Sequence, residues 1–208
     1  MQHKNLPPCV AKTRPVGGLA PDTFIHADPY FLGCRFHALL RRVRDHSPLS
    51  ANEKAMLPWL SALRAELRGL GVRYLEPEVR LAGANGLPGG ICDLVATGGL
   101  ARRGAIEVKV TDAVPDEPEA GHLLQVGGYA ELLGHRSMTG AVWAALAYVS
   151  FREARVRVFA YRDARELIRR AHRLFTRNAA DASRPFHVVS RKARCGVPSG
   201  EGGRARLH

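Results

Sequence analysis

The sequence predicts an α/β fold for most of this chain, with a mixed central β-sheet flanked by α-helices. Two observations support that class. At 208 residues and 46% hydrophobic content, the chain is long enough to bury one sizeable core. Segments with strand-like apolar patterns also alternate with segments of helical periodicity. The expected strands are 72–81, 91–96, 104–112, 140–149 and 154–161, and the expected helices are 33–44, 50–70, 120–134 and 163–178.

The composition is strongly basic. A formal charge of +12 and a pI near 10.3 predict a polyanionic partner, and arginine, which binds phosphate in a bidentate manner, carries most of the charge. Nucleic acid is the first expectation and an anionic membrane surface is the second. No apolar run approaches the roughly 18 residues of a membrane span. The first residues lack the apolar core of a signal peptide, so we expect a cytoplasmic protein without a membrane partner.

Proline and glycine divide the chain into three parts. Residues 1–22 are rich in both and predict a flexible N-terminal arm, whereas residues 23–180 hold the periodic segments and form the main domain. Residues 181–208 are basic and contain several glycines, which predicts a disordered tail. The cysteines are scattered without any C-x-x-C pair, so neither a disulfide framework nor a zinc site is expected. They are Cys9, Cys34, Cys92 and Cys195.

The first half of the main domain supplies packing helices and one strand. His37 lies in helix 33–44, and residue chemistry alone favours an ordinary half-buried histidine there. A capping box, Ser50 with Glu53, opens helix 50–70, in which Pro58 either causes a kink or marks the true first turn.

Strand 72–81 contains Pro77, which favours an edge position or a bulge. Glu76 and Glu78 share a face of that strand. Either could add a carboxylate to a site, although solvated strand glutamates are commoner.

A predicted hairpin, 91–96 followed by 104–112, carries the most chemistry. Turn residues between the two runs favour antiparallel pairing, which brings Asp93 beside Glu107 and Lys109. Because a strand repeats every two residues, Glu107 and Lys109 share one face, and the apolar residues of the strand share the other. Two carboxylates and an ammonium group at the edge of an apolar sheet predict a site for a hard divalent cation, with a positive group left for an anionic oxygen.

The following helix, 120–134, places Gln125 and Tyr129 four residues apart on one face. Gly127 and Gly128 are costly inside a helix, so the close approach of another backbone is expected there. Segment 140–149 is expected to be a buried strand and 154–161 an edge strand. The final helix carries an arginine run that fits a solvated face and a phosphate-tracking face equally well. Its members are Arg165, Arg169, Arg170, Arg173 and Arg177.

These residues together resemble the PD-(D/E)XK nuclease superfamily. Asp93, followed by Glu107-Val108-Lys109 after a short hairpin, is similar to its signature, with Cys92 where proline would stand. Two flanking motifs resemble those of the RecB-type nucleases, namely Gly33-x-x-x-His37 before the hairpin and Gln125-x-x-x-Tyr129 after it. The four motifs occur in the order of that family and cover roughly residues 28–150.

The resemblance implies a restriction-endonuclease-like core and a divalent-metal-dependent DNase, of exonuclease type, acting in DNA repair, recombination or defence. By the same resemblance, Mg²⁺ or Mn²⁺ would be held by His37, Asp93, Glu107 and the carbonyl of Val108. Lys109 would position or activate water, and Gln125 and Tyr129 would lie near the metal and the bound strand.

Relatives with an iron–sulfur cluster use one cysteine before the core and three after it. Only Cys195 follows the core here, so no cluster is expected. No helicase motif is present, so any unwinding would come from a helicase or recombination partner.

Two other functions remain open on the sequence. One is a noncatalytic DNA-binding protein on the same fold, and the other is an assembly module whose basic surface contacts RNA. The presence of Asp93, Glu107 and Lys109 favours the enzyme. The sequence leaves open the digestion polarity, the strand preference, exonuclease against endonuclease action, the oligomeric state and the pathway.

Overall fold

The computed structural model, which describes residues 10–17, 22–135 and 142–180, is built around a six-stranded sheet of order β1-β6-β5-β4-β3-β2. β4 and β5 run parallel, and the other neighbouring strands run antiparallel. The predicted α/β class with a mixed central sheet is therefore confirmed. The strands are β1 (Val10–Pro15), β2 (Val72–Leu81), β3 (Gly90–Gly98), β4 (Arg103–Val110), β5 (Val142–Ser150) and β6 (Arg155–Tyr161).

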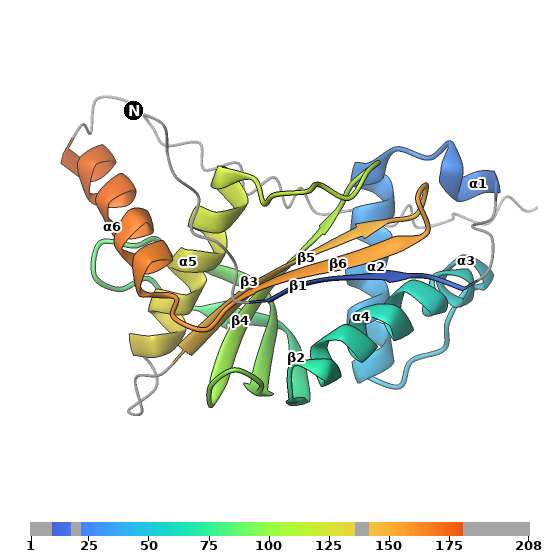
Figure 1. Cartoon of the computed structure of the whole chain (residues 1–208), viewed down its shortest axis with the longest axis horizontal. Helices are drawn as coiled ribbons and strands as arrows, with labels where there is room; N and C mark the ends of the chain where they lie inside the picture. The colour runs from blue at the N-terminus through green and yellow to red at the C-terminus, as the bar shows by residue number, and fades with distance from the viewer. Residues whose placement is uncertain (1–9, 18–21, 136–141, 181–208) are drawn as a thin grey trace, which may run out of the picture.

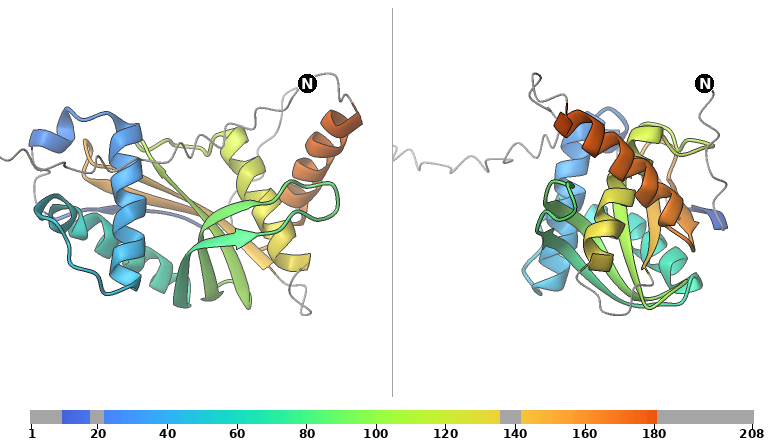
Figure 2. Two further views of the ribbon diagram at one scale, coloured as in Figure 1. Left: turned by 180° about the vertical axis from the view of Figure 1, so that it is seen from behind. Right: turned by 90° about the vertical axis from the view of Figure 1, so that its left-hand side faces the viewer.

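Helices cover both faces of this sheet (Figure 1). One apolar core joins the sheet to α2 and α4, and a second joins its other face to α5 and α6. The turned views in Figure 2 show these two helix pairs on either side of the sheet. α5 is the crossover between the parallel strands β4 and β5. No helix among the described residues is long and apolar enough to cross a membrane. The helices are α1 (Asp22–Ile25), α2 (Pro29–Arg44), α3 (Ala51–Ala55), α4 (Leu57–Gly69), α5 (Ala120–His135) and α6 (Arg165–Ala180).

Local sequence signals explain where these helices begin. Asp28 caps α2 by accepting a hydrogen bond from the Tyr30 amide, and Pro29 occupies the first turn. Ser50 and Glu53 form the predicted capping box of α3. The helical segment is interrupted at Met56, which ends α3 and precedes α4, and Pro58 lies in the first turn of α4. Pro58 thus marks a helix start, the second of the two alternatives for the proline in segment 50–70.

The N-terminal arm predicted for residues 1–22 is wrong at Val10–Pro15, because these residues form β1 along the free side of β6. Arg14 also forms an ion pair with Glu66 of α4, with 2.5 Å between Nε and Oε1. The prediction of an edge position for 154–161 is wrong for the same reason. Residues 1–9 and the predicted tail, 181–208, lie outside the described residues.

β3 and β4 pair from Thr97 and Arg103 as far as Leu94 and Ile106. Beyond that pair, β4 continues along β5 alone. β2, on the other side of β3, is an edge strand as Pro77 predicted, and its Glu78 has a left-handed φ of 54°. The hairpin therefore opens at the end where Asp93, Glu107 and Lys109 lie.

α5 and α6 approach closely at one of the two glycines that the sequence singled out. A Cβ added at Gly127 would lie 2.7 Å from the carbonyl oxygen of Leu167 in α6. The expected close backbone approach is therefore confirmed at Gly127, and it fixes α6 on the outer side of α5.

Candidate functional site

The Asp93 carboxylate occupies the gap between the diverging strands. The side chain is 1% exposed, and its Oδ2 accepts a hydrogen bond from the Val108 amide at 2.9 Å. That amide has no β3 backbone partner because the ladder has already ended at Ile106. A strand residue directs its N–H and C=O to the same side, so the Val108 carbonyl also faces the gap. Asp93 and the Val108 carbonyl thus present oxygen atoms at one place.

Glu107 and Lys109 project from β4 toward α5. Lys109 Nζ donates hydrogen bonds to Glu107 Oε1 and to Gln125 Oε1, both at 2.8 Å. Gln125 Nε2 then donates to the Tyr129 hydroxyl at 3.4 Å. The predicted shared face is confirmed, since Ile106 and Val108 pack into the opposite core, with α2 and α4. The structure therefore joins the carboxylate, the ammonium group, the amide and the phenol in one chain of contacts.

His37 approaches Asp93 from the other helical layer. Its Nδ1 lies 3.6 Å from Asp93 Oδ1, and the ring is partly exposed. Gly33, one turn earlier on α2, lies against Val110 with room for a methyl group, because an added Cβ would be 3.7 Å from Val110 Cβ. Asp93 therefore contacts α2 on one side and β4 on the other, and the adjacent β4 residues Val108 and Glu107 connect these contacts to the chain that runs through Lys109 to Tyr129.

Burial controls the titratable groups around the carboxylates. Burial raises the pKa of the Tyr129 phenol, and the negative charge of Glu107 raises it further. Its ring packs on Gly90, where an added Cβ would come within 2.8 Å of Tyr129 Cε1. Burial also raises the pKa of the Cys92 thiol, whose sulfur lies 3.3 Å from the Leu94 carbonyl oxygen. Cys92 is thus a buried neutral thiol that packs beneath the site.

His122 is a site neighbour that the sequence analysis missed. Its Nδ1 lies 3.0 Å from the Tyr148 hydroxyl. Burial lowers the pKa of His122, and the charge of nearby Lys109 lowers it further, while Glu119 opposes both. The spacing 122, 125, 129 puts His122 on the face of α5 that carries Gln125 and Tyr129, and that signal could have found it.

The other residues that the sequence singled out lie elsewhere. Glu78 is held by Arg41 of α2 at 3.0 Å, and Glu76 is exposed. On α6, one glutamate, Glu166, pairs with three arginines, and these pairs lower its pKa. The three are Arg169, Arg170 and Arg173. The arginine run is therefore partly neutralised within its own helix.

The side chains at this site are of the types that bind a hard divalent cation, but their positions do not form a metal site. Asp93 and Glu107, at 1% and 2% exposure, are carboxylates withdrawn from water, and burial of such groups is costly without a balancing cation. As placed, however, no group of three or more His, Cys, Asp and Glu side chains in the described ranges could hold a metal ion. Lys109 Nζ donates a hydrogen bond to Glu107 Oε1, so a metal would reach Glu107 through Oε2 or by displacing Lys109 from Oε1.

Comparisons with known proteins add no functional assignment. No protein-family model matches the chain, and no curated protein matches it. Among solved structures, one described as "Crystal structure of SSO0001" aligns with 15% identity and a TM-score of 0.36. That alignment covers 76% of this chain and 72% of the other.

Proposed function

We propose that this protein is a divalent-metal-dependent deoxyribonuclease that hydrolyses phosphodiester bonds, with an exonuclease as the favoured type. The observation that carries the proposal is the convergence at the open end of the β3–β4 hairpin. Two buried carboxylates, a lysine, a histidine, an amide and a phenol meet there from α2, β3, β4 and α5. The resemblance to the RecB-type nucleases, which rests on the same residues, supports the exonuclease assignment by analogy.

Asp93, Glu107 and the Val108 carbonyl are the oxygen donors that would hold Mg²⁺ or Mn²⁺, and His37 would complete the set. A bound divalent cation would neutralise a non-bridging phosphate oxygen and lower the pKa of a water molecule. The chain contributes the remaining chemistry. Lys109 supplies a positive charge where the attacked phosphate becomes more negative, and its hydrogen bond to Gln125 fixes that ammonium group in place.

Gln125 and Tyr129 would position the substrate strand. A phenol is protonated at neutral pH even at its ordinary pKa, and burial of Tyr129 raises that pKa further, so its O–H is a hydrogen-bond donor rather than a second negative charge beside Glu107. A neutral donor on this face suits a phosphate or sugar oxygen of the substrate strand. The basic composition, with a net charge of +12, supports a nucleic-acid substrate.

The first experiment compares hydrolysis of single-stranded DNA, duplex DNA and RNA, each with Mn²⁺ and with EDTA. Metal-dependent hydrolysis of DNA, absent in Asp93→Asn, is the expected result. End-labelled and circular substrates then separate exonuclease from endonuclease action. DNA binding without hydrolysis of any substrate would instead favour the noncatalytic DNA-binding protein. Selective binding of RNA would favour the assembly module.

A further inference from the structure

A groove with basic walls lies between α2, α4 and β2, apart from the residues of the candidate site. Its volume is about 490 Å³. Leu40, Leu63, Leu67 and Leu94 belong to its apolar part, whereas Arg64 and Arg68 line it from α4. Arg73 and Tyr74 line it from β2, and no aspartate or glutamate does. The groove thus combines an apolar floor with positive charge.

Three of the four arginines that line this groove form no ion pair within the described residues, whereas the fourth, Arg44, pairs with Asp45. Arg64 and Arg68 are exposed and lie four residues apart, on one face of α4. Neither they nor Arg73 form an ion pair with any carboxylate in the described part of the chain. The arginines of α6 differ, because Glu166 binds three of them. Charge complementarity therefore favours binding of an anionic ligand at α4 and β2 rather than at α6.

Tyr74 adds a flat surface to these charges. It is 59% exposed, which is unusual for a large aromatic side chain, and it stands beside Arg73. Arginines that track a phosphate backbone beside an exposed aromatic ring are the features that bind single-stranded nucleic acid, since every base can stack on such a ring.

Two elements of the candidate site, α2 and β3, also line the groove. Leu94 follows Asp93 on β3, and Leu40 lies one turn beyond His37 on α2. A strand that lies in the groove would therefore reach the opened end of the hairpin past these two residues.

We propose that this groove binds the single-stranded part of the DNA substrate and leads it to the candidate site. The inference rests on the proposed nuclease function and specifies that the candidate site receives single-stranded DNA. Arg64, Arg68 and Arg73 contact phosphates, and Tyr74 stacks on a base. A peptide strand added to the edge of β2 fits less well. Pro77 has no N–H to donate, and its carbonyl already accepts a hydrogen bond from Arg44 Nη1 at 3.3 Å.

The test measures binding of fluorescein-labelled oligothymidylate to the full-length protein by anisotropy, in EDTA and over a series of NaCl concentrations. Each phosphate contact on a single strand contributes about 0.7 to the slope of log K against log salt. The triple variant Arg64→Ala/Arg68→Ala/Arg73→Ala should therefore flatten the slope by about 2. Tyr74→Ala should weaken binding about tenfold without changing the slope, and Tyr74→Phe should restore the affinity.

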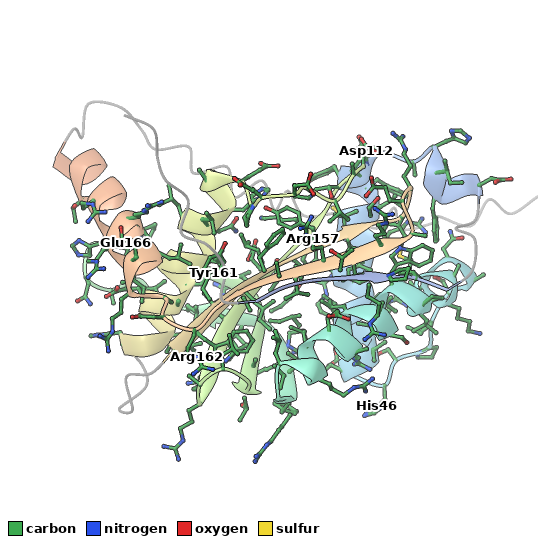
Figure 3. All side chains as sticks on the ribbon, viewed as in Figure 1. His46, Asp112, Arg157, Tyr161, Arg162 and Glu166 are labelled. Carbon is green, nitrogen blue, oxygen red and sulfur yellow. The ribbon has the colours of Figure 1, made fainter. Side chains whose placement is uncertain are left out.

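The matched control is Arg169→Ala/Arg170→Ala/Arg173→Ala, which removes the same number of arginines from α6. Figure 3 labels His46, which lines the groove, and Glu166 of α6 at opposite ends of the molecule. The α6 triple should flatten the slope by less than half as much as the groove triple. An equal or larger effect of the α6 triple, or an unchanged slope in the groove triple, would overturn the proposal.

A second arm replaces the oligonucleotide with labelled polyglutamate. If the groove triple lost polyglutamate binding but kept its affinity for oligothymidylate, the groove would be a peptide site and the proposal would be overturned. Binding in EDTA is independent of hydrolysis, so the two proposals fail separately. A groove variant with a flattened slope in a protein that cuts nothing would refute only the nuclease. Cleavage together with an unchanged slope would refute only the groove.

Discussion

The Asp93 carboxylate accepts a hydrogen bond from the Val108 amide at 2.9 Å, where β3 and β4 stop pairing. One side chain thus has two roles. It replaces the missing strand partner of a buried amide, and it presents an anionic oxygen to the proposed metal. The backbone contact holds Asp93 beside the carbonyl that would share the cation.

Substitution of Asp93 separates these roles. Asp93→Asn retains an oxygen that can accept from Val108, so it should unfold close to the wild-type urea midpoint. Asp93→Ala leaves the buried amide without that acceptor and should lose about 1–3 kcal/mol of unfolding free energy. Both variants should lose Mn²⁺ binding by calorimetry and DNA cleavage, because both lack the anionic ligand. Cleavage by Asp93→Asn at the wild-type rate would show that Asp93 is not a metal ligand of the active site.

His37 should contribute less to metal affinity than Asp93. It brings no balancing negative charge, and its Nδ1 lies 3.6 Å from Asp93 Oδ1. We expect His37→Ala to weaken Mn²⁺ binding without abolishing it, by at least the roughly 10- to 100-fold seen when a residue that only orients a metal ligand is removed. Calorimetric titration measures this, with His26→Ala, at an exposed histidine, as the control. A complete loss of Mn²⁺ binding in His37→Ala would make His37 the dominant ligand.

Two glycines inside helices, Gly33 of α2 and Gly127 of α5, should respond in opposite ways to alanine substitution. A methyl group at Gly127 would meet the Leu167 carbonyl oxygen at 2.7 Å, so Gly127→Ala should cost about 1–3 kcal/mol through overpacking of α5 against α6. Gly33→Ala has room against Val110 and should stabilise α2 by up to about 1 kcal/mol. Urea unfolding of both variants checks this. A loss of stability in Gly33→Ala would mean that the motif glycine has a steric role in the fold.

The hairpin and its polar face could be predicted because their signals are local. A period of two and a turn-rich connection place Glu107 beside Lys109 without knowledge of the rest of the fold. β1 could not be predicted in this way, since Val10–Pro15 is short, contains a proline and becomes a strand only by pairing with β6. The position of His122 depends on how α5 packs on β4 and β5.

The arginine run shows a limit of a different kind. The spacing of Glu166 from Arg169, Arg170 and Arg173 is helical and visible in the sequence. The pairing itself requires side-chain positions, as does the unneutralised charge of α4. Arginine density alone therefore left a solvated face and a phosphate-tracking face equally open for α6.

His122 predicts a pH dependence of stability. Its folded pKa lies below the ordinary value of 6.5, chiefly because of burial. On acidification the unfolded chain takes up its proton first, so stability falls as pH drops through 6.5 and stops falling below the folded pKa. His122→Gln should reduce this loss, measured as the urea midpoint on both sides of that pH. An unchanged pH profile in His122→Gln would show that His122 titrates alike in the folded and unfolded chains.

Lys109 is expected to act on the reaction rather than on metal binding. It donates a hydrogen bond to Glu107 Oε1 at 2.8 Å, so it competes with the cation for that carboxylate oxygen. Lys109→Ala should therefore keep or tighten Mn²⁺ binding, while single-turnover cleavage falls about 10²–10³-fold for want of a charge that acts in the transition state.

The variant also leaves Glu107 buried without its cation, which should cost about 2 kcal/mol of stability in EDTA. Mn²⁺ should restore that loss, because the metal takes the place of the ammonium group beside Glu107. Lys109→Arg, which keeps the charge, is the matched control for folding, and Gln125→Ala, which removes only the anchor of Lys109, should slow cleavage less than Lys109→Ala. If Lys109→Ala lost Mn²⁺ as completely as Asp93→Ala, the division between metal ligands and a charge acting on the phosphate would have to be abandoned.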